Sequence, residues 1–283
     1  MSDTKTDTSN PELLVKEKLD ELVSFRKTTE SMHEFWAKQY DLGLAWVQFP
    51  EGSGGLDLNP KFQLMINETL RKEGISINNR IANILGIGMG APTIAEFGTD
   101  EQKNKYLPEL ISGHKIGCFG LTESEAGSDP SSMKTTYKKD KDGYILNGSK
   151  NWITNSSIAD IFIVWALNEK FETHSIKGFI LEKNTKGLTV SPINNKTSLK
   201  ISPTGQILLE NVFIPKSNCL QYTNGWSSVF SCLNKARFGI SWGVLGAATE
   251  CWLISKEYVE NRIMFKKPLA ANQLIQKKLA DMQ

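Results

Sequence analysis

The segment Cys118-Phe119-Gly120-Leu121-Thr122-Glu123-Ser124-Glu125-Ala126-Gly127-Ser128-Asp129-Pro130 separates a helical part of this chain from a β-rich part. Its apolar start predicts a short strand, and the small and polar residues that follow favour an irregular loop. Backbone N–H groups of such a loop can face an anion, although an ordinary surface turn has a similar composition. The rest of the chain is needed to choose between the two.

Size and composition are those of an ordinary folded protein. The chain has 283 residues, 40% hydrophobic and 23% charged, which leaves room for two or three packed units. A net charge of +2 without a Lys/Arg run argues against nucleic-acid binding. Apolar runs such as Ile161 to Leu167 are too short for a membrane span, and the polar first ten residues resemble neither a secretory signal nor an Arg-rich presequence. A bacterial cytoplasmic protein is therefore the favoured expectation, and a mitochondrial matrix protein is the alternative for a eukaryotic source.

Neither the cysteines nor the histidines form a recognisable site. Cys118, Cys219, Cys232 and Cys251 include no CxxC pair and have no histidine at ligand spacing. Reduced, mostly buried thiols are therefore expected, with no zinc and no disulfide framework. The three histidines lie far apart in polar surroundings and are interpreted as surface residues.

Residues 11–115 have the pattern of a helical domain, preceded by a tail at residues 1–10 that we expect to be disordered. Val15, Leu19 and Leu22 recur at i, i+4 and i+7 and define one apolar stripe. Thr99 and Gln102 have the spacing of a capping box, which predicts a helix from there to about residue 112.

One motif in this helical part imitates a dinucleotide-binding fingerprint. Gly86 to Ala91 fits G-x-G-x-x-A, which requires a strand before it and a helix after it. Here Pro92 follows at once, and Arg80 to Leu85 has the pattern of a helix interior. The glycines are interpreted as positions of close packing, against a neighbouring backbone or a ligand.

Residues 116–225 have the pattern of a small β domain. Asn147-Gly148 lies between two β-like runs, Gly143 to Leu146 and Ser149 to Thr154, and predicts a tight hairpin. Turn residues separate further short strands at the spacing of a small barrel or sandwich. These strands are expected at Ile161 to Ala166, Gly178 to Leu181, Leu188 to Pro192 and Gln206 to Phe213.

Residues 226–283 return to a helical pattern. Trp226 to about Arg262 contains no proline and is predicted to form one long helix. Phe265 to Pro268 interrupts it, and a second helix is predicted to begin near Leu269. We interpret this segment as the start of a C-terminal helical domain.

These features together resemble the acyl-CoA dehydrogenase family. The opening segment is similar to the family's first signature, and Trp152-Ile153-Thr154-Asn155 is similar to the W-I-T-N that follows it. Arg262, Phe265 and Gln273 resemble the R-x-x-F…Q segment of the last helical bundle. The resemblance implies an N-terminal helical bundle, a middle β-barrel or sandwich, and a C-terminal helical bundle that is incomplete here. Residues 233–240 and 272–280 look most like glutaryl-CoA dehydrogenase.

The resemblance implies FAD-dependent α,β-dehydrogenation of an acyl-CoA thioester. The favoured substrate is glutaryl-CoA, which would be both oxidised and decarboxylated, to crotonyl-CoA. A carboxylate removes the α proton, and the flavin accepts a hydride from the β carbon. The residues that the resemblance assigns to the flavin are Phe119, Leu121, Thr122, Ser128, Trp152, Thr154, Arg262, Phe265 and Gln273. Those that it assigns to the substrate are Arg80, Ser128 and Arg237.

The resemblance also implies partners. Arg262, Phe265 and Gln273 would reach the flavin of a neighbouring subunit, so a homo-oligomer, by resemblance a tetramer, is expected. Electron-transfer flavoprotein is the expected electron acceptor.

Arg80 stands in an otherwise neutral, apolar segment, where a guanidinium needs an anionic partner. By resemblance to glutaryl-CoA dehydrogenases, Arg80 would hold the distal carboxylate of a dicarboxylic acyl chain. The alternative is a helix-end arginine paired with Glu73 or Asp100.

The family's catalytic glutamate has no counterpart in this sequence. In most of the family it lies beyond the position of Gln283, and in a minority it lies at the position of Ala236, where alanine cannot accept a proton. We therefore expect the base to lie outside this chain. The chain itself is interpreted as C-terminally truncated or as one part of a split protein. Lys266 replaces the family's usual glycine, so an altered turn is expected there. Two alternatives stay open: a short-chain acyl-CoA dehydrogenase without carboxylate specificity, and a non-catalytic remnant or partner subunit.

Overall fold

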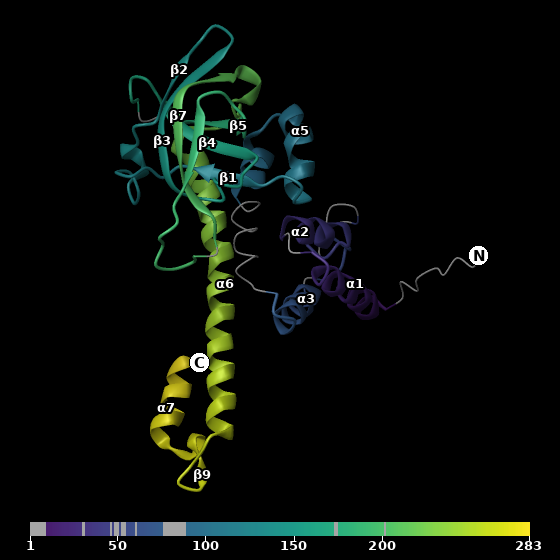
Figure 1. The fold of residues 1–283 in the computed structure, drawn as a ribbon. Helices are drawn as coiled ribbons and strands as arrows, with labels where there is room; N and C mark the ends of the chain where they lie inside the picture. Colours follow the sequence, from purple (N-terminus) through teal and green to yellow (C-terminus); the bar gives the residue numbers. More distant parts are fainter. Residues whose placement is uncertain are drawn as a thin grey trace, which may run out of the picture. The chain divides into compact units, whose positions relative to one another are not determined.

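The computed structural model describes residues 10–29, 32–45, 47, 51, 55–59, 61–75, 89–172, 175–200 and 202–283. The elements follow the predicted order of helices, strands and helices, and they form two compact units, Met1–Phe230 and Ser231–Gln283 (Figure 1). The helices are α1 (Pro11–Arg26), α2 (Met32–Asp41), α3 (Lys61–Lys72), α5 (Asp100–Ile111), α6 (Gly225–Asn261) and α7 (Gln273–Met282), with a further helical segment at residues 89–97. Among the residues that the structure describes, none of these helices combines the length and apolar character needed to cross a membrane.

The first helices are held together by the predicted apolar stripe. Val15, Leu19 and Leu22 are at most 1% exposed, and they pack with Phe35 of α2 and Ile66 of α3 in one hydrophobic cluster. The side-chain oxygen of Asn10 caps α1 by accepting the backbone N–H groups of the second and third helical residues. The periodicity of the sequence thus identified both this helix and its buried face.

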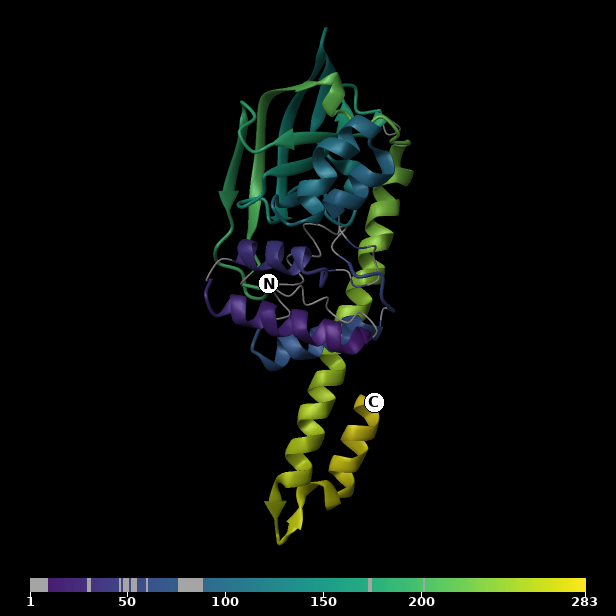
Figure 2. The same ribbon diagram turned by 90° about the vertical axis from the view of Figure 1, so that its right-hand side faces the viewer.

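Helix α5 begins with the predicted capping box, because Thr99 and Gln102 exchange side-chain to backbone hydrogen bonds. Gln102 does more than cap the helix. Its Nε2 donates to the carbonyl oxygens of Ser217 and Cys219, at 2.6 and 2.9 Å. Lys105 and Tyr106 also bond to Glu182 of the sheet, each at 2.9 Å, so α5 is fastened to the β-rich part (Figure 2).

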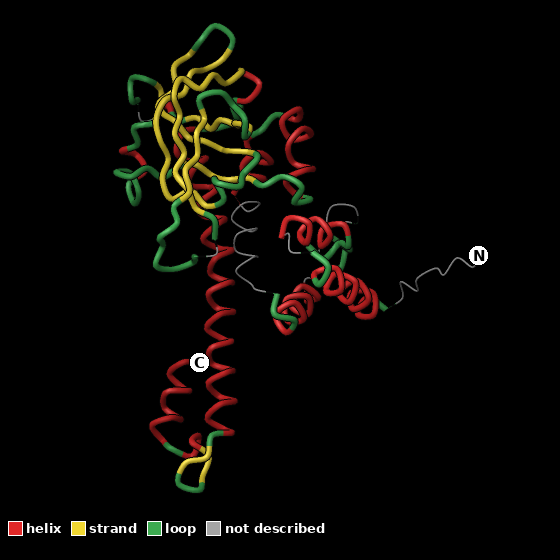
Figure 3. Tube along the Cα trace, in the orientation of Figure 1, coloured by secondary structure: helices red, strands yellow, loops and turns green. Residues whose placement is uncertain are grey.

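The strands form one seven-stranded sheet in the order β1-β4-β2-β3-β7-β6, with β5 paired to β4. Strand β4 is parallel to β1 and to β2, and the other pairs are antiparallel. Figure 3 shows these strands, in yellow, gathered in one body. They are β1 (Gly117–Gly120), β2 (Thr136–Lys139), β3 (Gly143–Thr154), β4 (Ile161–Asn168), β5 (Lys177–Glu182), β6 (Leu188–Pro192) and β7 (Thr204–Pro215).

The predicted hairpin at Asn147-Gly148 is wrong. These residues lie inside β3, which runs unbroken for 12 residues, and the turn that precedes it lies between β2 and β3. Asn147 Oδ1 accepts the backbone N–H of Asn211 on β7 at 2.8 Å, and the pairing with β7 shifts register between Leu146 and Gly148. The pairing therefore has a β-bulge on β7, where Glu210 and Asn211 stand opposite Asn147. A glycine is needed at position 148 because its φ is +143° and a Cβ would lie 2.6 Å from Cα of Thr135.

We predict that Gly148→Ala lowers the free energy of unfolding by about 2–4 kcal/mol, because the methyl group would collide with the backbone at Thr135. Urea denaturation measures the change. Gly246→Ala in α6 is the control: its methyl meets nothing within 4 Å, and a helix-interior alanine is favoured by about 0.5–1 kcal/mol. A Gly148→Ala protein as stable as the wild type would contradict this account of Gly148.

The second unit confirms the long helix and its interruption. After α6, strands β8 (Ile263–Met264) and β9 (Lys267–Pro268) form a small hairpin, and α7 runs back beside the end of α6 (Figures 1 and 2). The indole Nε1 of Trp252 donates to the carbonyl oxygen of Leu279 at 3.0 Å. Helix α7 begins at Gln273, later than predicted, because a short 3-10 turn (Leu269–Ala271) precedes it and Asn272 caps it.

Candidate functional site

The loop that follows β1 is closed by its own backbone. Glu123 and Ala126 exchange backbone hydrogen bonds of 3.2 Å each, and Asp129 accepts the N–H of Ser131 at 3.1 Å to begin the short 3-10 turn Pro130–Ser132. Leu121 is buried, whereas Ser128 is exposed. The loop therefore has an anchored start and an exposed, small-residue tip.

The end of β3 carries a second bulge. The pairing with β7 shifts register between Lys150 and Ile153, and Trp152 has φ +60°. A tryptophan rarely adopts a positive φ, and such strained conformations persist where the surroundings fix them. The N–H of Trp152 donates to Asn151 Oδ1 at 3.0 Å, and the indole is 56% exposed. A large aromatic face is thus held out from the sheet on a constrained backbone.

Hydrogen bonds join the two predicted flavin segments. The backbone N–H of Asn151 donates to the carbonyl oxygen of Thr122 at 2.8 Å, and Asn151 Nδ2 donates to Ser124 Oγ at 3.1 Å. Thr122 of the loop and Trp152 of the bulge are therefore brought into the same site. The other predicted flavin residues of this unit are Phe119 on β1, half-buried and 6.0 Å from the Trp165 ring, and Thr154 at the end of β3.

A buried ion pair that was not predicted from the sequence lies beneath this site. Lys150 Nζ lies 2.8 Å from Glu123 Oε1, and the two side chains are 0% and 8% exposed. Lys150 also donates to the carbonyl oxygen of Leu121 at 3.0 Å and contacts the Met133 sulfur at 3.9 Å. The pattern of β3 contained a hint, since alternation from Leu146 puts Lys150 on the same face of the strand.

Burial and pairing shift the pKa of both groups. Burial lowers the pKa of Lys150 from its ordinary 10.5 to about 8, and the charge of Glu123 opposes this shift only in part. For Glu123, burial acts to raise the pKa, but the charge of Lys150 and hydrogen bonds from the backbone and side chains outweigh it, so the pKa is lowered. At neutral pH both groups are charged.

We predict that Lys150 gives the protein a distinctive dependence of stability on pH. Between about pH 8 and 10.5 the unfolded chain keeps the Lys150 proton while the folded protein releases it. The free energy of unfolding, taken relative to Lys150→Met, should therefore rise with pH across this window, by on the order of 2 kcal/mol. Urea denaturation at several pH values measures the difference.

Lys134 is the matched control for this prediction. It is exposed, its bond to Glu125 raises its pKa above 10.5, and Lys134→Met should give no such slope between pH 8 and 10.5. A difference between wild type and Lys150→Met that stays flat or falls over this window would show that Lys150 keeps its proton in the folded protein.

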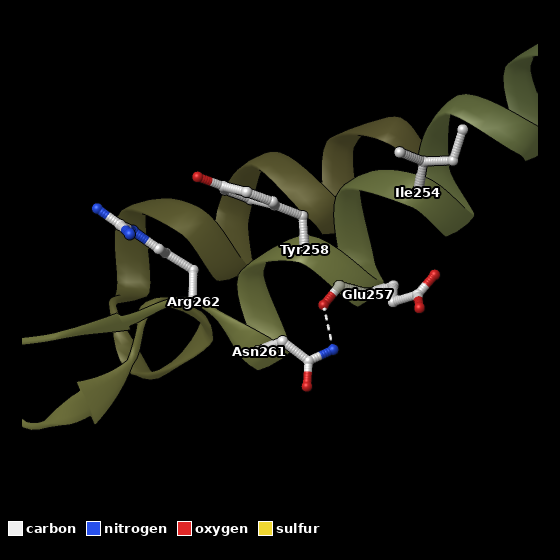
Figure 4. A pocket seen from close by; sticks show the side chains of 5 residues that line it. All are labelled: Ile254, Glu257, Tyr258, Asn261 and Arg262. Carbon is white, nitrogen blue, oxygen red and sulfur yellow. Dashed lines mark hydrogen bonds between the residues drawn. The ribbon is translucent and has the colours of Figure 1, made fainter.

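The remaining predicted site residues of the described chain lie in the second unit. Figure 4 shows Arg262 at the end of α6, in an open depression of about 480 Å³ that Ile254, Glu257, Tyr258 and Asn261 also line. Phe265 is 95% exposed at the tip of the β8–β9 hairpin, and Gln273 is exposed at the start of α7. Arg237 on α6 is exposed and bonds to Asn234 Oδ1 at 2.8 Å.

Two further expectations concern Lys266 and Arg80. Phe265 and Lys266 both have positive φ, +50° and +65°, so the hairpin tip adopts the backbone of a glycine-type turn with lysine in it. The turn is thus formed without glycine, at the cost of local strain.

Arg80 and Gly86 to Gly88 lie outside the described residues. In the described part of the chain, no group of three or more His, Cys, Asp or Glu side chains could hold a metal ion. All four cysteines are free, and Cys251 is exposed.

Comparisons with known proteins identify the family. Residues 12–114, 118–212 and 223–283 match the N-terminal, middle and C-terminal domains of acyl-CoA dehydrogenase. An acyl-CoA dehydrogenase of Bacillus subtilis is 38% identical, over 90% of this chain and 68% of that protein. A short-chain specific acyl-CoA dehydrogenase of Megasphaera elsdenii is 34% identical, over 100% of this chain and 70% of that protein.

A solved structure agrees with this match. The glutaryl-CoA dehydrogenase from Mycobacterium smegmatis in complex with FADH2 superposes with a TM-score of 0.76 at 34% identity, over 96% of this chain and 71% of that chain. The chain spans between 41% and 70% of the length of the curated relatives considered. The sequence, the order of the domains and the fold agree, and the chain belongs to the acyl-CoA dehydrogenase family of oxidoreductases.

Proposed function

We propose that this chain forms the flavin-binding part of an FAD-dependent acyl-CoA dehydrogenase. The observation that carries the proposal is the hydrogen bond between Thr122 and Asn151, which joins the loop after β1 to the bulge at Trp152. Taken separately, the two segments would be a surface loop and an irregular strand end. Joined, they form one surface of the first unit that offers hydroxyls, backbone N–H groups and an aromatic face.

The residues present fit a flavin dinucleotide. A flat ring system requires an apolar or aromatic face, and the indole of Trp152 is held out on a constrained bulge. A pyrophosphate requires N–H and hydroxyl donors, and Ser128 lies at the exposed tip of a loop where Gly127 has open space around it. Thr122, which is half-buried in the same loop, is proposed to donate its hydroxyl to a ring oxygen.

When bound, FAD supplies the electron sink for the hydride that leaves the β carbon. The residues of this chain bind and orient: Thr122, Trp152 and Thr154 the ring, and Ser128 the phosphates. Ala236 of α6 cannot serve as the base, because its side chain has no group that accepts a proton.

We predict that the purified chain binds FAD and that Thr122→Val weakens binding about tenfold, since one hydrogen bond to the flavin is lost. Quenching of flavin fluorescence on titration measures the dissociation constant. Thr249→Val is the matched control, because the Thr249 hydroxyl bonds within α6, to the Leu245 carbonyl at 3.0 Å. A wild-type chain that binds no FAD would refute the proposal for this chain, and would favour the alternative of a non-catalytic partner subunit.

The favoured substrate is glutaryl-CoA. Support comes from the resemblance of residues 233–240 and 272–280 to glutaryl-CoA dehydrogenases and from Arg80, which would hold the distal carboxylate, while Arg237 would lie near the CoA end of the substrate. The runner-up is a plain short-chain acyl-CoA, because a short-chain specific relative is also 34% identical.

We predict that Arg80→Ala raises KM for glutaryl-CoA by 10-fold or more and leaves KM for butyryl-CoA unchanged, because only the former has a second carboxylate for the guanidinium. Dye reduction by the holoenzyme, with the base-bearing segment supplied, measures both constants. Lys72→Ala on α3 removes an exposed cation of the same helical domain and should change neither. Equal KM values for glutaryl-CoA in wild type and Arg80→Ala would contradict the role of Arg80 and would favour a short-chain acyl-CoA as the substrate.

Assembly and electron transfer complete the proposal. Arg262, Phe265 and Gln273 are proposed to contact the flavin of another subunit of a homotetramer, and their exposure in the second unit supports this role. Electron-transfer flavoprotein is the proposed acceptor.

A further inference from the structure

We propose that Lys150 and Glu123 are positioning residues, whose buried ion pair fixes Thr122, the Ser128 loop and the Trp152 bulge in the arrangement that receives the flavin. The inference rests on the flavin-binding role proposed above. It concerns two residues that the family resemblance did not bring into the site.

Lys150 bonds to the residues on both sides of Thr122. Its ammonium donates to the carbonyl oxygen of Leu121 at 3.0 Å and to the carboxylate of Glu123 at 2.8 Å. The next residue, Asn151, donates its backbone N–H to Thr122 itself at 2.8 Å. Three consecutive loop residues are therefore bonded to two consecutive residues of β3, which leaves the Thr122 backbone little freedom to rotate.

Glu123 closes the base of the loop. Its Oε2 accepts the backbone N–H of Lys134 at 2.7 Å, and its Oε1 accepts that of Thr135 at 3.0 Å. The carboxylate at the start of the loop thus binds the backbone where the loop ends. Residues 124–133, which include Ser128, lie between these two fixed points. A neutral apolar pair of the same size could fill the space but could not make these bonds.

The pair faces inward and acts through its neighbours. The three N–H bonds of the ammonium are directed to Leu121, Glu123 and Met133, and both carboxylate oxygens have partners. The lysine stem passes over Gly120, where an added Cβ would lie 3.4 Å from Lys150 Cγ. Because its donors are used inside the protein, Lys150 is a positioning residue rather than one that touches the flavin.

An ion pair this deep is not needed for stability alone. Replacing both partners of a buried pair by neutral groups is often harmless, whereas removing one partner leaves a buried charge uncompensated. The double variant Glu123→Gln/Lys150→Met therefore separates positioning from folding, since it leaves no buried charge behind. The control is Glu125→Gln/Lys134→Met, which removes the exposed pair of the same residue types on the same loop.

The test measures the FAD dissociation constant and the visible spectrum of bound flavin, together with amide hydrogen exchange of residues 121–135 and 151–155. In the double variant we expect a cooperative unfolding transition, at least tenfold weaker FAD binding, a shifted flavin absorption band and faster exchange in both segments. The control variant should match the wild type in every readout. Glu123→Gln alone keeps an acceptor oxygen and should fall between the two.

A double variant that folds, binds FAD as tightly as wild type with the same spectrum and exchanges no faster overturns the inference. If the wild type itself binds no FAD, the proposed function fails, and hydrogen exchange alone decides about the pair. Faster exchange in the double variant but not in the control then supports its hold on the loop, and equal exchange refutes it. If the double variant does not fold, Glu123→Gln/Lys150→Gln, which also leaves no buried charge, carries the same comparison.

Discussion

A lysine ammonium inside a protein has to find acceptors for its three N–H bonds, and Lys150 finds them in the loop that follows β1. This requirement links two parts of the sheet that are not neighbours in sequence. The loop cannot swing away without leaving a charge in the interior, and the end of β3 cannot straighten without withdrawing the lysine. The exposed indole of Trp152 and the exposed tip at Ser128 are both placed by this internal bond network.

Much of the fold follows from local patterns in the sequence. Local patterns predicted two of the helices correctly. They are the apolar stripe of Val15, Leu19 and Leu22 and the capping box at Thr99. The hairpin prediction at Asn147-Gly148 fails because the same two residues can also lie inside a strand, opposite a bulge of the neighbouring strand. Contacts with residues distant in sequence determine which of the two forms. These are the hydrogen bond to Asn211 on β7 and the close approach of Thr135, and a local sequence pattern contains neither.

In the candidate site, too, some residues could be located from local sequence patterns and others only from contacts between distant residues. The motif around Thr122 and the W-I-T-N segment could be located from the sequence, and the structure brings them together through a backbone bond. Lys150 was overlooked because lysine is ordinarily a surface residue and its partner lies in a loop rich in polar residues. Only the three-dimensional pairing shows that one of the two glutamates of that loop is buried and the other exposed. Arg80, in contrast, remains a hypothesis drawn from the sequence.

The separation of the paired residues along the chain bears on how the protein folds. Lys150 and Glu123 are 27 residues apart, and β1 pairs in parallel with β4 across an even longer loop. Closing such loops loses chain entropy before any contact compensates, so these pairings form slowly compared with the helices. The loop after β1 can reach its final shape only once β3 has joined the sheet. A newly made chain therefore completes its core first and its cofactor surface late, and during synthesis no fragment ending before β3 can present that surface.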